Sequence, residues 1–315
     1  MTGTLQAFYA NFQIAARILV NFKAIFGFGA TSGGRTNITN LVSNTGVAAG
    51  DLSGIGTTRG YTCAAPFGTG RAIFGFGYTT GPMAITNLVS NTGVLAGDTA
   101  AAGGVSARYY AAGAGYGDDK AIFGYGQTGT PVLAVTNLVS NTGVMAANQA
   151  AVTGSARTAL GAANYGFDKA IFGYGWTTGN VSTSNLVSNT GVVAGDVASA
   201  GTARNQLAAA GYGADKAIFG FGTDNQTTFG VGFNMTNLVS NTGVVAANAT
   251  GVGSVRYGLA AARYGTDTAI FGFGATTSTK LNVTNLVSNT GLVAANQAAL
   301  TGSARAWMGA SNYGI

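Results

Sequence analysis

Hydrophobic and polar positions follow one another along this chain in short runs, and the same order of runs returns about every fifty residues. Each apolar run is four to ten residues long and is bounded by Gly, Asn, Asp or Thr. Runs of this length between turn-forming residues predict short β-strands. The phrase AIFG(F/Y)G occurs six times, and NLVSNTG follows each copy after a variable insert. A period near fifty residues indicates one supersecondary unit that is copied along the chain.

One unit reads as four strands. In the copy that contains Arg157, we expect strands over residues 156–165, 169–175, 185–188 and 192–196. Phe172 and Tyr174 should share one face of the second strand, because side chains alternate along a strand. The SNTG segment fits a three-residue hairpin loop with Gly191 in the left-handed region that glycine enters freely. The unit is therefore predicted to be a four-stranded antiparallel meander.

Six such units predict an all-β fold, a six-bladed β-propeller. The repeated Arg precedes the second strand by 12 residues in the complete units, but Arg17 precedes Lys23 by only 6. The first unit therefore lacks a first strand, whereas residues 304–315 form a surplus one. We expect residues 304–315 to complete the first blade, so that residues 23–315 form one ring closed by overlap of the chain ends. An open array, or a ring closed by oligomerisation, is the alternative.

Residues 1–22 precede the repeats and carry a different pattern. Their apolar positions recur every three to four residues, which predicts an amphipathic helix; they include Leu5, Phe8, Phe12 and Leu19. Such a segment either packs on the face of its own propeller or docks on a partner subunit. The sequence leaves both interpretations open.

An arginine recurs at the start of the first strand of each unit. The series consists of Arg59, Arg108, Arg157, Arg204, Arg256 and Arg305. Six cations around a channel could hold an anion. However, carboxylates also recur before the AIFG strand (Asp119, Asp168, Asp215 and Asp267), and Arg pairs well with carboxylates or backbone carbonyls. The structural interpretation is favoured.

The inserts between AIFG(F/Y)G and NLVSNTG differ in every copy and should emerge together on one face. Variable loops on a constant frame are typical of a recognition surface, although relaxed constraint would give the same variation. The side chains most suited to recognition are Arg35, Tyr78, Trp176, Phe229, Phe233 and Lys280. Their aromatic rings are of the kind that stack on sugars or anchor protein contacts.

Composition argues against an enzyme. The chain has no His and no Glu, and Cys63 is its one cysteine. A Ser-His-Asp triad and zinc sites built from His and Cys are therefore excluded, and no cofactor or metal is expected. Cys63 is best interpreted as a buried, inert thiol. The net charge of +6 is the difference between 15 scattered Lys and Arg and nine Asp, and this scatter does not favour nucleic-acid binding. No apolar run reaches the length of a transmembrane helix, so membrane insertion is not expected.

The order of these segments resembles that of Kelch repeats over residues 23–315. Kelch units run through an Arg-led strand of small residues, an aromatic strand that ends in Gly-Gly, and a later hairpin. The same order appears in this chain as Arg204, KAIFGFG (216–222) and NLVSNTG (237–243). Two departures stand out: an aromatic residue, Phe221, splits the Gly pair, and Leu238 and Val244 replace the Tyr and Trp of Kelch units.

The nearly verbatim phrases also resemble repeat proteins encoded by tailed bacteriophages. This resemblance implies a non-enzymatic structural protein of the virion that contacts other capsid or tail proteins and presents its variable loops for protein or host contact. The alternative is a surface adhesin or lectin-like propeller that binds host glycans. A homo-oligomer is compatible with either function.

Overall fold

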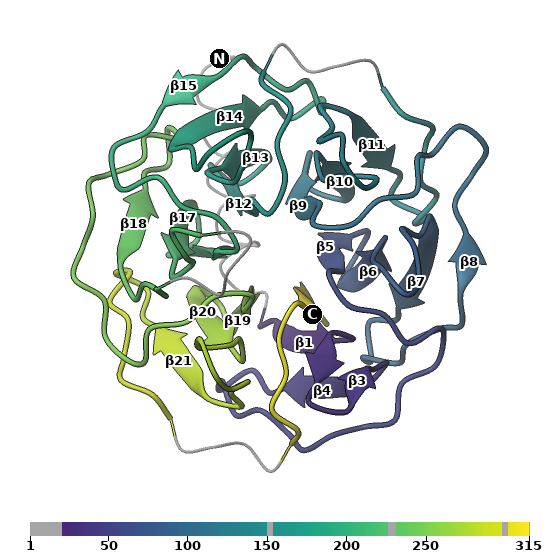
Figure 1. The fold of residues 1–315 in the computed structure, drawn as a ribbon, viewed down its shortest axis with the longest axis horizontal. Coiled ribbons are helices and arrows are strands. Elements are labelled where there is room, and N and C mark those ends of the chain that lie inside the picture. Colours follow the sequence, from purple (N-terminus) through teal and green to yellow (C-terminus); the bar gives the residue numbers. More distant parts are fainter. Residues whose placement is uncertain (1–20, 150–153, 226–230, 298–301, 315) are drawn as a thin grey trace, which may run out of the picture.

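The computed structural model describes residues 21–149, 154–225, 231–297 and 302–314. Every helix or strand assigned within these residues is a β-strand, and the fold is all-β. The strands form several small antiparallel sheets that stand around a common centre (Figure 1). In the described part of the chain, no helix is long and apolar enough to span a bilayer.

The repeats form sheets of three or four strands, and the strands of a sheet lie side by side in the order in which they are named. The sheets are β22 (Gly309–Tyr313), β1 (Lys23–Gly27) and β4 (Thr39–Val42); β5 (Cys63–Phe67), β6 (Arg71–Gly75), β7 (Ile85–Val89) and β8 (Thr99–Ala100); β9 (Ala112–Tyr116), β10 (Lys120–Gly124) and β11 (Thr136–Val139). They continue with β12 (Gly161–Tyr165), β13 (Lys169–Gly173), β14 (Thr183–Val187) and β15 (Val197–Ala198); β16 (Ala208–Tyr212), β17 (Lys216–Gly220) and β18 (Thr236–Val239); β19 (Ala260–Tyr264), β20 (Thr268–Gly272) and β21 (Thr284–Val287). A two-stranded hairpin of β2 (Ala30–Thr31) and β3 (Gly34–Arg35) lies in the first variable insert.

The first strand of each sheet lies nearest the centre (Figure 1). Each of these inner strands contacts the inner strands of both neighbouring sheets: β5 contacts β9, and the series continues through β12, β16, β19 and β22 back to β5. The middle strand of each sheet is buried on both faces. In β13, for example, Ala170, Ile171 and Phe172 are fully buried. Neighbouring sheets therefore pack against each other through buried apolar clusters, one of which joins β9 and β10 to β13.

The AIFG glycine allows adjacent sheets to approach closely. A Cβ atom on Gly173 would lie 2.6 Å from Cζ of Phe219 in the next sheet, and a Cβ atom on Gly124 would lie 2.8 Å from Cζ of Phe172. The same arrangement recurs from sheet to sheet, and it ends with Gly272 against Phe26 at 2.7 Å. The aromatic ring of each sheet thus fills the space that the missing side chain of its neighbour leaves.

The second strand is shorter than the sequence pattern predicts. β13 ends at Gly173, and Tyr174 takes a left-handed φ of 63°. This turn interrupts the alternation of side chains between the two faces of the strand. Phe172 therefore packs edge-on against Tyr125 of one neighbouring sheet, while Tyr174 packs against Phe219 of the other. The expectation that Phe172 and Tyr174 share one face is therefore wrong.

The fourth strand is also less regular than predicted. The predicted strand 192–196 is represented by one bridge between Val187 and Val193, and the paired segment is β15, which begins at Val197. The Asp that ends the predicted strand bonds instead to a buried arginine. By contrast, the hairpin loop follows the prediction, since Gly191 has a φ of 85°.

β22 pairs with β1 in antiparallel register, from Lys23 opposite Tyr313 to Gly27 opposite Gly309. The C-terminal strand therefore occupies the inner position beside β1. The predicted N-terminal helix, with Leu5, Phe8, Phe12 and Leu19, lies outside the described residues.

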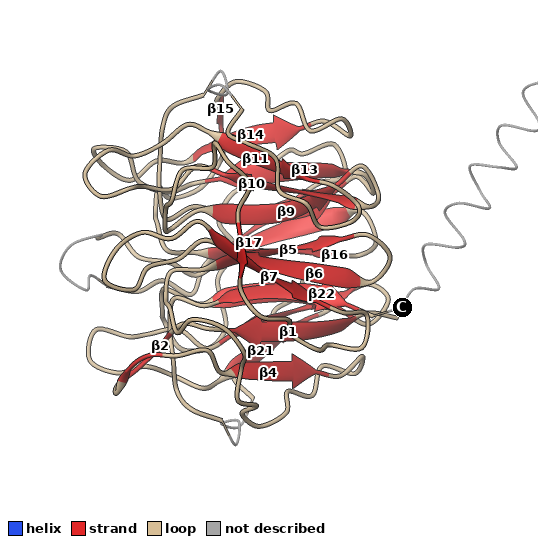
Figure 2. Cartoon of the chain, turned by 90° about the vertical axis from the view of Figure 1, so that its right-hand side faces the viewer, coloured by secondary structure: helices blue, strands red, loops and turns tan. Residues whose placement is uncertain are grey.

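Figure 2 shows the strands running between two faces of the molecule. We call one the loop face, because the variable inserts that follow the AIFG(F/Y)G motif lie there. We call the other the hairpin face; it carries the turns between first and second strands, at residues 68–70, 117–119, 166–168, 213–215 and 265–267.

Candidate functional site

The loop face brings several of the sequence-predicted residues together. Arg35, Tyr78 and Trp176 come from three different inserts and line one pocket of about 470 Å³. Lys280 lines a neighbouring pocket of about 400 Å³ together with Trp307. Phe233 lines neither pocket and instead bridges through its backbone to Arg256. Phe229 lies outside the described residues.

Four tyrosines form the centre of this surface. The Tyr61 ring lies 4.5 Å from that of Tyr110 and 5.9 Å from that of Tyr109, and Tyr78 lies 4.9 Å from Tyr109. Trp307 extends the cluster at 5.4 Å from Tyr61. We call these five residues the aromatic cluster. Their side chains remain partly exposed, so their rings are available to a ligand.

A cycle of backbone hydrogen bonds positions the central members of this surface. Six residues take part: Tyr61, Tyr110, Ala159, Gln206, Gly258 and Trp307. Each donates its backbone N–H to the carbonyl of the preceding member of this list, so that Tyr110 donates to Tyr61. Tyr61 in turn donates to Trp307, and the distances range from 2.6 to 3.3 Å. All six have a left-handed φ between 53° and 61°. This unusual conformation, which costs most for bulky residues, places their side chains at the loop-face end of the inner strands.

The largest ring in the cycle is fixed by its neighbours. Trp307 donates from Nε1 to Oε1 of Gln206 at 2.8 Å. A Cβ atom on Gly258 would lie only 2.7 Å from that Nε1 atom, so glycine makes room for the indole. Tyr61, Tyr110, Gln206 and Trp307 therefore crowd the central axis at this end.

Polar and charged groups surround the aromatic cluster. The Arg35 guanidinium lies 4.8 Å from the Tyr78 ring centre, and the Lys280 ammonium lies 5.7 Å from that of Trp307. Gln127 donates to the Tyr109 hydroxyl at 2.6 Å. Burial raises the pKa of both Tyr61 and Tyr110, so their hydroxyl groups stay protonated near neutral pH. The surface thus offers ring faces, hydroxyls, an amide and two cations to a ligand.

Sequence reasoning missed Tyr61, Tyr109, Tyr110 and Trp307, although a signal was present. The two residues after each repeated Arg differ among the copies, reading Gly-Tyr, Tyr-Tyr, Thr-Ala, Asn-Gln, Tyr-Gly and Ala-Trp. Variation between copies was the criterion applied to the inserts. The same criterion applied to these dipeptides would have found the missing half of the surface.

The repeated arginines lie in the interior and do not form part of this surface. All six are fully buried. Each guanidinium stacks on the second aromatic ring of a preceding AIFG(F/Y)G motif, with distances from 3.8 Å for Arg59 over Phe28 to 4.5 Å for Arg305 over Phe273. Arg59 also donates to Oδ1 of Asn87 in NLVSNTG at 2.6 Å. These contacts agree with a structural role.

The acidic partners of these arginines differ from those that the sequence pattern suggested. Arg59, Arg157 and Arg305 pair with Asp98, Asp196 and Asp51, at 3.7, 3.3 and 3.5 Å. The recurring Asp119, Asp168 and Asp215 instead accept hydrogen bonds from the Asn of the SNTG loops, at 3.0 to 3.1 Å. On the hairpin face, each of these hydrogen bonds joins the turn before an AIFG strand to the SNTG loop of the same repeat.

Cys63 is buried, and burial raises the pKa of its thiol to about 12. The thiol is therefore protonated at neutral pH and is a poor nucleophile. Among the described residues, no three acidic or cysteine side chains gather as a metal site would require.

No protein-family model matches the chain, and a search of curated proteins finds no significant match.

Proposed function

We propose that the chain is a non-enzymatic, Kelch-like six-bladed β-propeller that acts as a rigid recognition platform and binds glycans through its loop face. The observation that carries this proposal is the gathering of Tyr61, Tyr78, Tyr109, Tyr110 and Trp176 around one pocket. Flat aromatic rings stack on the apolar faces of sugar rings, while hydroxyls and amides bond to sugar hydroxyls.

Three features support the closed, six-bladed part of this proposal. The contacts between inner strands return to their starting point. The backbone hydrogen bonds from Tyr61 to Trp307 do the same. β22 supplies β1 with the inner neighbour that the first repeat lacks in its own sequence.

A glycan array probed with the full chain tests the function, followed by calorimetry with the glycan that binds best. Tyr109→Ala and Trp176→Ala should each weaken binding by roughly tenfold, since loss of an anchoring aromatic costs about 1–2 kcal/mol. Their thermal midpoints should stay close to that of the wild type. Val192→Ala is the matched control, because Val192 is 67% exposed in a loop on the hairpin face. An array without any binding, or equal binding by the two aromatic variants, would reject a glycan site on this face.

The resemblance to phage repeat proteins leads to a second proposal: the platform is a virion component that contacts capsid or tail proteins, with residues 1–22 as its docking segment. Mass spectrometry of density-purified particles tests it. Co-purification in fixed stoichiometry with the major capsid protein supports virion localisation, whereas recovery in the cell-surface fraction supports an adhesin.

A further inference from the structure

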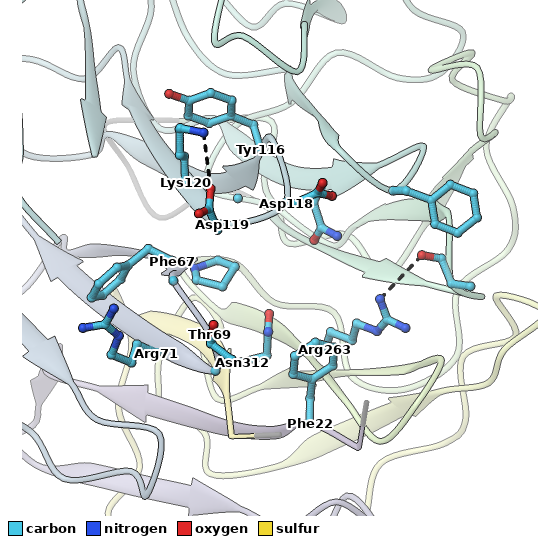
Figure 3. Close-up of a pocket in the computed structure, with 17 residues that line it drawn as sticks. Phe22, Phe67, Thr69, Arg71, Tyr116, Asp118, Asp119, Lys120, Arg263 and Asn312 are labelled. Carbon is cyan, nitrogen blue, oxygen red and sulfur yellow. Dashed lines mark hydrogen bonds and ion pairs between the residues drawn. The ribbon is translucent and has the colours of Figure 1, made fainter. Parts of the chain in front are cut away.

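A second cavity opens on the hairpin face, at the opposite end of the inner strands from the aromatic cluster (Figure 3). Its volume is about 360 Å³, which is within the range of small-molecule sites. Phe22, Phe67 and Phe167 contribute apolar walls, and Asp118 and Lys120 also line it. The loop-face end of the axis is crowded by the residues of the hydrogen-bond cycle, so this cavity is entered from the hairpin face.

The cavity is lined by one position of the inner strands whose residue type differs among the repeats. The equivalent residues of the six repeats are Pro66, Gly115, Asn164, Gly211, Arg263 and Asn312. Only the copy in β19 carries a cation there. Pro66, Gly115, Asn164, Arg263 and Asn312 all line the cavity, so the glycine and proline positions leave space beside the three polar side chains.

The Arg263 guanidinium is held in place but is only partly satisfied. Its Nη2 atom donates to the carbonyl of Thr266, and Nη1 lies 3.5 Å from the carbonyl of Ala214. Its Nε atom is buried and has no hydrogen-bond partner among the described residues. No carboxylate in the described part of the chain lies within ion-pair distance of it, but the nearby charge of Asp267 partly offsets the lowering of its pKa by burial. The Phe22 ring lies 5.2 Å away and supports the guanidinium plane.

Amide groups and apolar rings share the cavity with this guanidinium, and so do the carboxylates of Asp118 and Asp119, of which Asp119 pairs with Lys120 at 3.3 Å. Asn164 on β12 and Asn312 on β22 place amide groups at the same level of the cavity as Arg263, and Figure 3 shows Arg263, Asn312 and Phe22 around it. Both asparagines are only partly buried, so a ligand in the cavity can reach their side-chain amides.

We propose that this cavity binds a small organic carboxylate. The Arg263 guanidinium, which lines the cavity, supplies the N–H donors for the carboxylate oxygens. The amides of Asn164 and Asn312 add donors, and the phenylalanine rings contact the apolar body of the ligand. This site is independent of the glycan surface, because it lies on the opposite face.

Calorimetry of the full chain with benzoate, and with uncharged benzamide as the matched ligand, tests the proposal. The wild type should bind benzoate at least roughly tenfold more tightly than benzamide, because a hydrogen bond to a charged group contributes about 1.5–3 kcal/mol. Arg263→Asn should bind benzoate no better than benzamide. This variant should fold, because asparagine already occupies the equivalent positions 164 and 312.

Two further variants make the result specific. Lys169→Gln removes an exposed cation of the same face that does not line the cavity, and it should bind benzoate as the wild type does. Asn312→Asp places a competing carboxylate in the cavity and should weaken benzoate binding by about tenfold or more. This variant keeps the proposal testable if Arg263→Asn misfolds. Failure of the wild type to bind benzoate, equal affinity for benzamide, or unchanged binding by Arg263→Asn would each overturn the proposal.

Discussion

At the scale of single residues, the buried arginines show how a fully buried cation is accommodated. The Arg157 guanidinium lies over the Tyr125 ring at 4.4 Å, bonds to Asn185 and pairs with Asp196. Burial disfavours the charged form and lowers the pKa of this group. The ring face, the amide oxygen and the carboxylate offset that cost.

The carboxylate in this arrangement is replaced by an amide in some copies. This difference predicts how the stability of the protein depends on pH. Three copies have Asp51, Asp98 or Asp196, and the other three have Asn148, Asn248 or Asn296. Burial raises the pKa of Asp98, but the hydrogen bonds from Thr57 and Asn87 and the nearby Arg59 outweigh this effect, so the pKa falls below its usual 3.8. Asp51 and Asp196 behave in the same way.

We therefore expect the triple variant D51N/D98N/D196N to resist acid better than the wild type. A carboxyl with a lowered folded-state pKa stabilises the protein above about pH 4, and this contribution is lost as the pH falls below that value. The variant should lose about 0.5–1 kcal/mol per site at pH 7. It should retain the hydrogen bonds, because Asn296 accepts from Ser254 N–H at 3.2 Å and donates to its hydroxyl at 2.7 Å. Urea unfolding at pH 7 and pH 3 measures both effects, and an equal loss on acidification in the two proteins would contradict the assignment.

At the scale of elements, the stability of the molecule depends on how closely neighbouring sheets approach each other. The AIFG glycine of one sheet faces the phenylalanine of the next, as Gly173 faces Phe219. The loop glycine does the same: a Cβ atom on Gly191 would lie 3.0 Å from the Tyr116 ring of the neighbouring sheet. These glycines recur in every copy because each repeat makes the same contact.

Gly173→Ala should therefore destabilise the protein by about 1–3 kcal/mol, as expected for overpacking in a filled core. The added methyl group would overlap the Phe219 ring, which is itself fully buried. Gly103→Ala is the control, because a Cβ atom there meets no other atom within 4 Å. Chemical denaturation gives both values. Equal stability of the two variants would mean that the close sheet contact is not required.

At the scale of the whole molecule, the first repeat depends on the last residues of the chain. β1 has β4 on one side and β22 on the other, and β22 comes from the far end of the sequence. Arg305, which leads into β22, bonds to Asn40 and pairs with Asp51 at 3.5 Å. Segments from the two ends of the sequence therefore share one packing unit.

Removal of residues 304–315 should destabilise the entire molecule rather than fray one end. The truncation exposes the buried faces of β1, β19 and β5 and leaves the edge of β1 unpaired. We expect a large fall in the thermal midpoint by differential scanning calorimetry. Addition of a synthetic 304–315 peptide should restore part of it, and a scrambled peptide should not. A truncated protein with wild-type stability would contradict the stabilising role of β22 beside β1.

The sequence by itself determined the elements that depend on local patterns. It predicted strands and turns from the spacing of AIFG and NLVSNTG, and the left-handed glycine of the SNTG loop from the needs of a tight turn. The offset between Arg17 and Lys23 also predicted that residues 304–315 would complete the first unit. Each of these follows from chain connectivity or from backbone conformations that only certain residues adopt easily.

Tertiary structure alone decided the features that depend on contacts between copies. Tyr174 leaves the strand because its ring packs on Phe219 and under Arg204, which are non-local contacts. Non-local contacts also decide that the arginines pair with Asp98, Asp196 and Asp51 and not with the aspartates that precede the AIFG strands. The cluster of Tyr61, Tyr109 and Tyr110 arises only when inner strands from different repeats meet at the axis. A local pattern does not encode which of several similar units will stand side by side, and so it could indicate candidate residues but not the surface that they form.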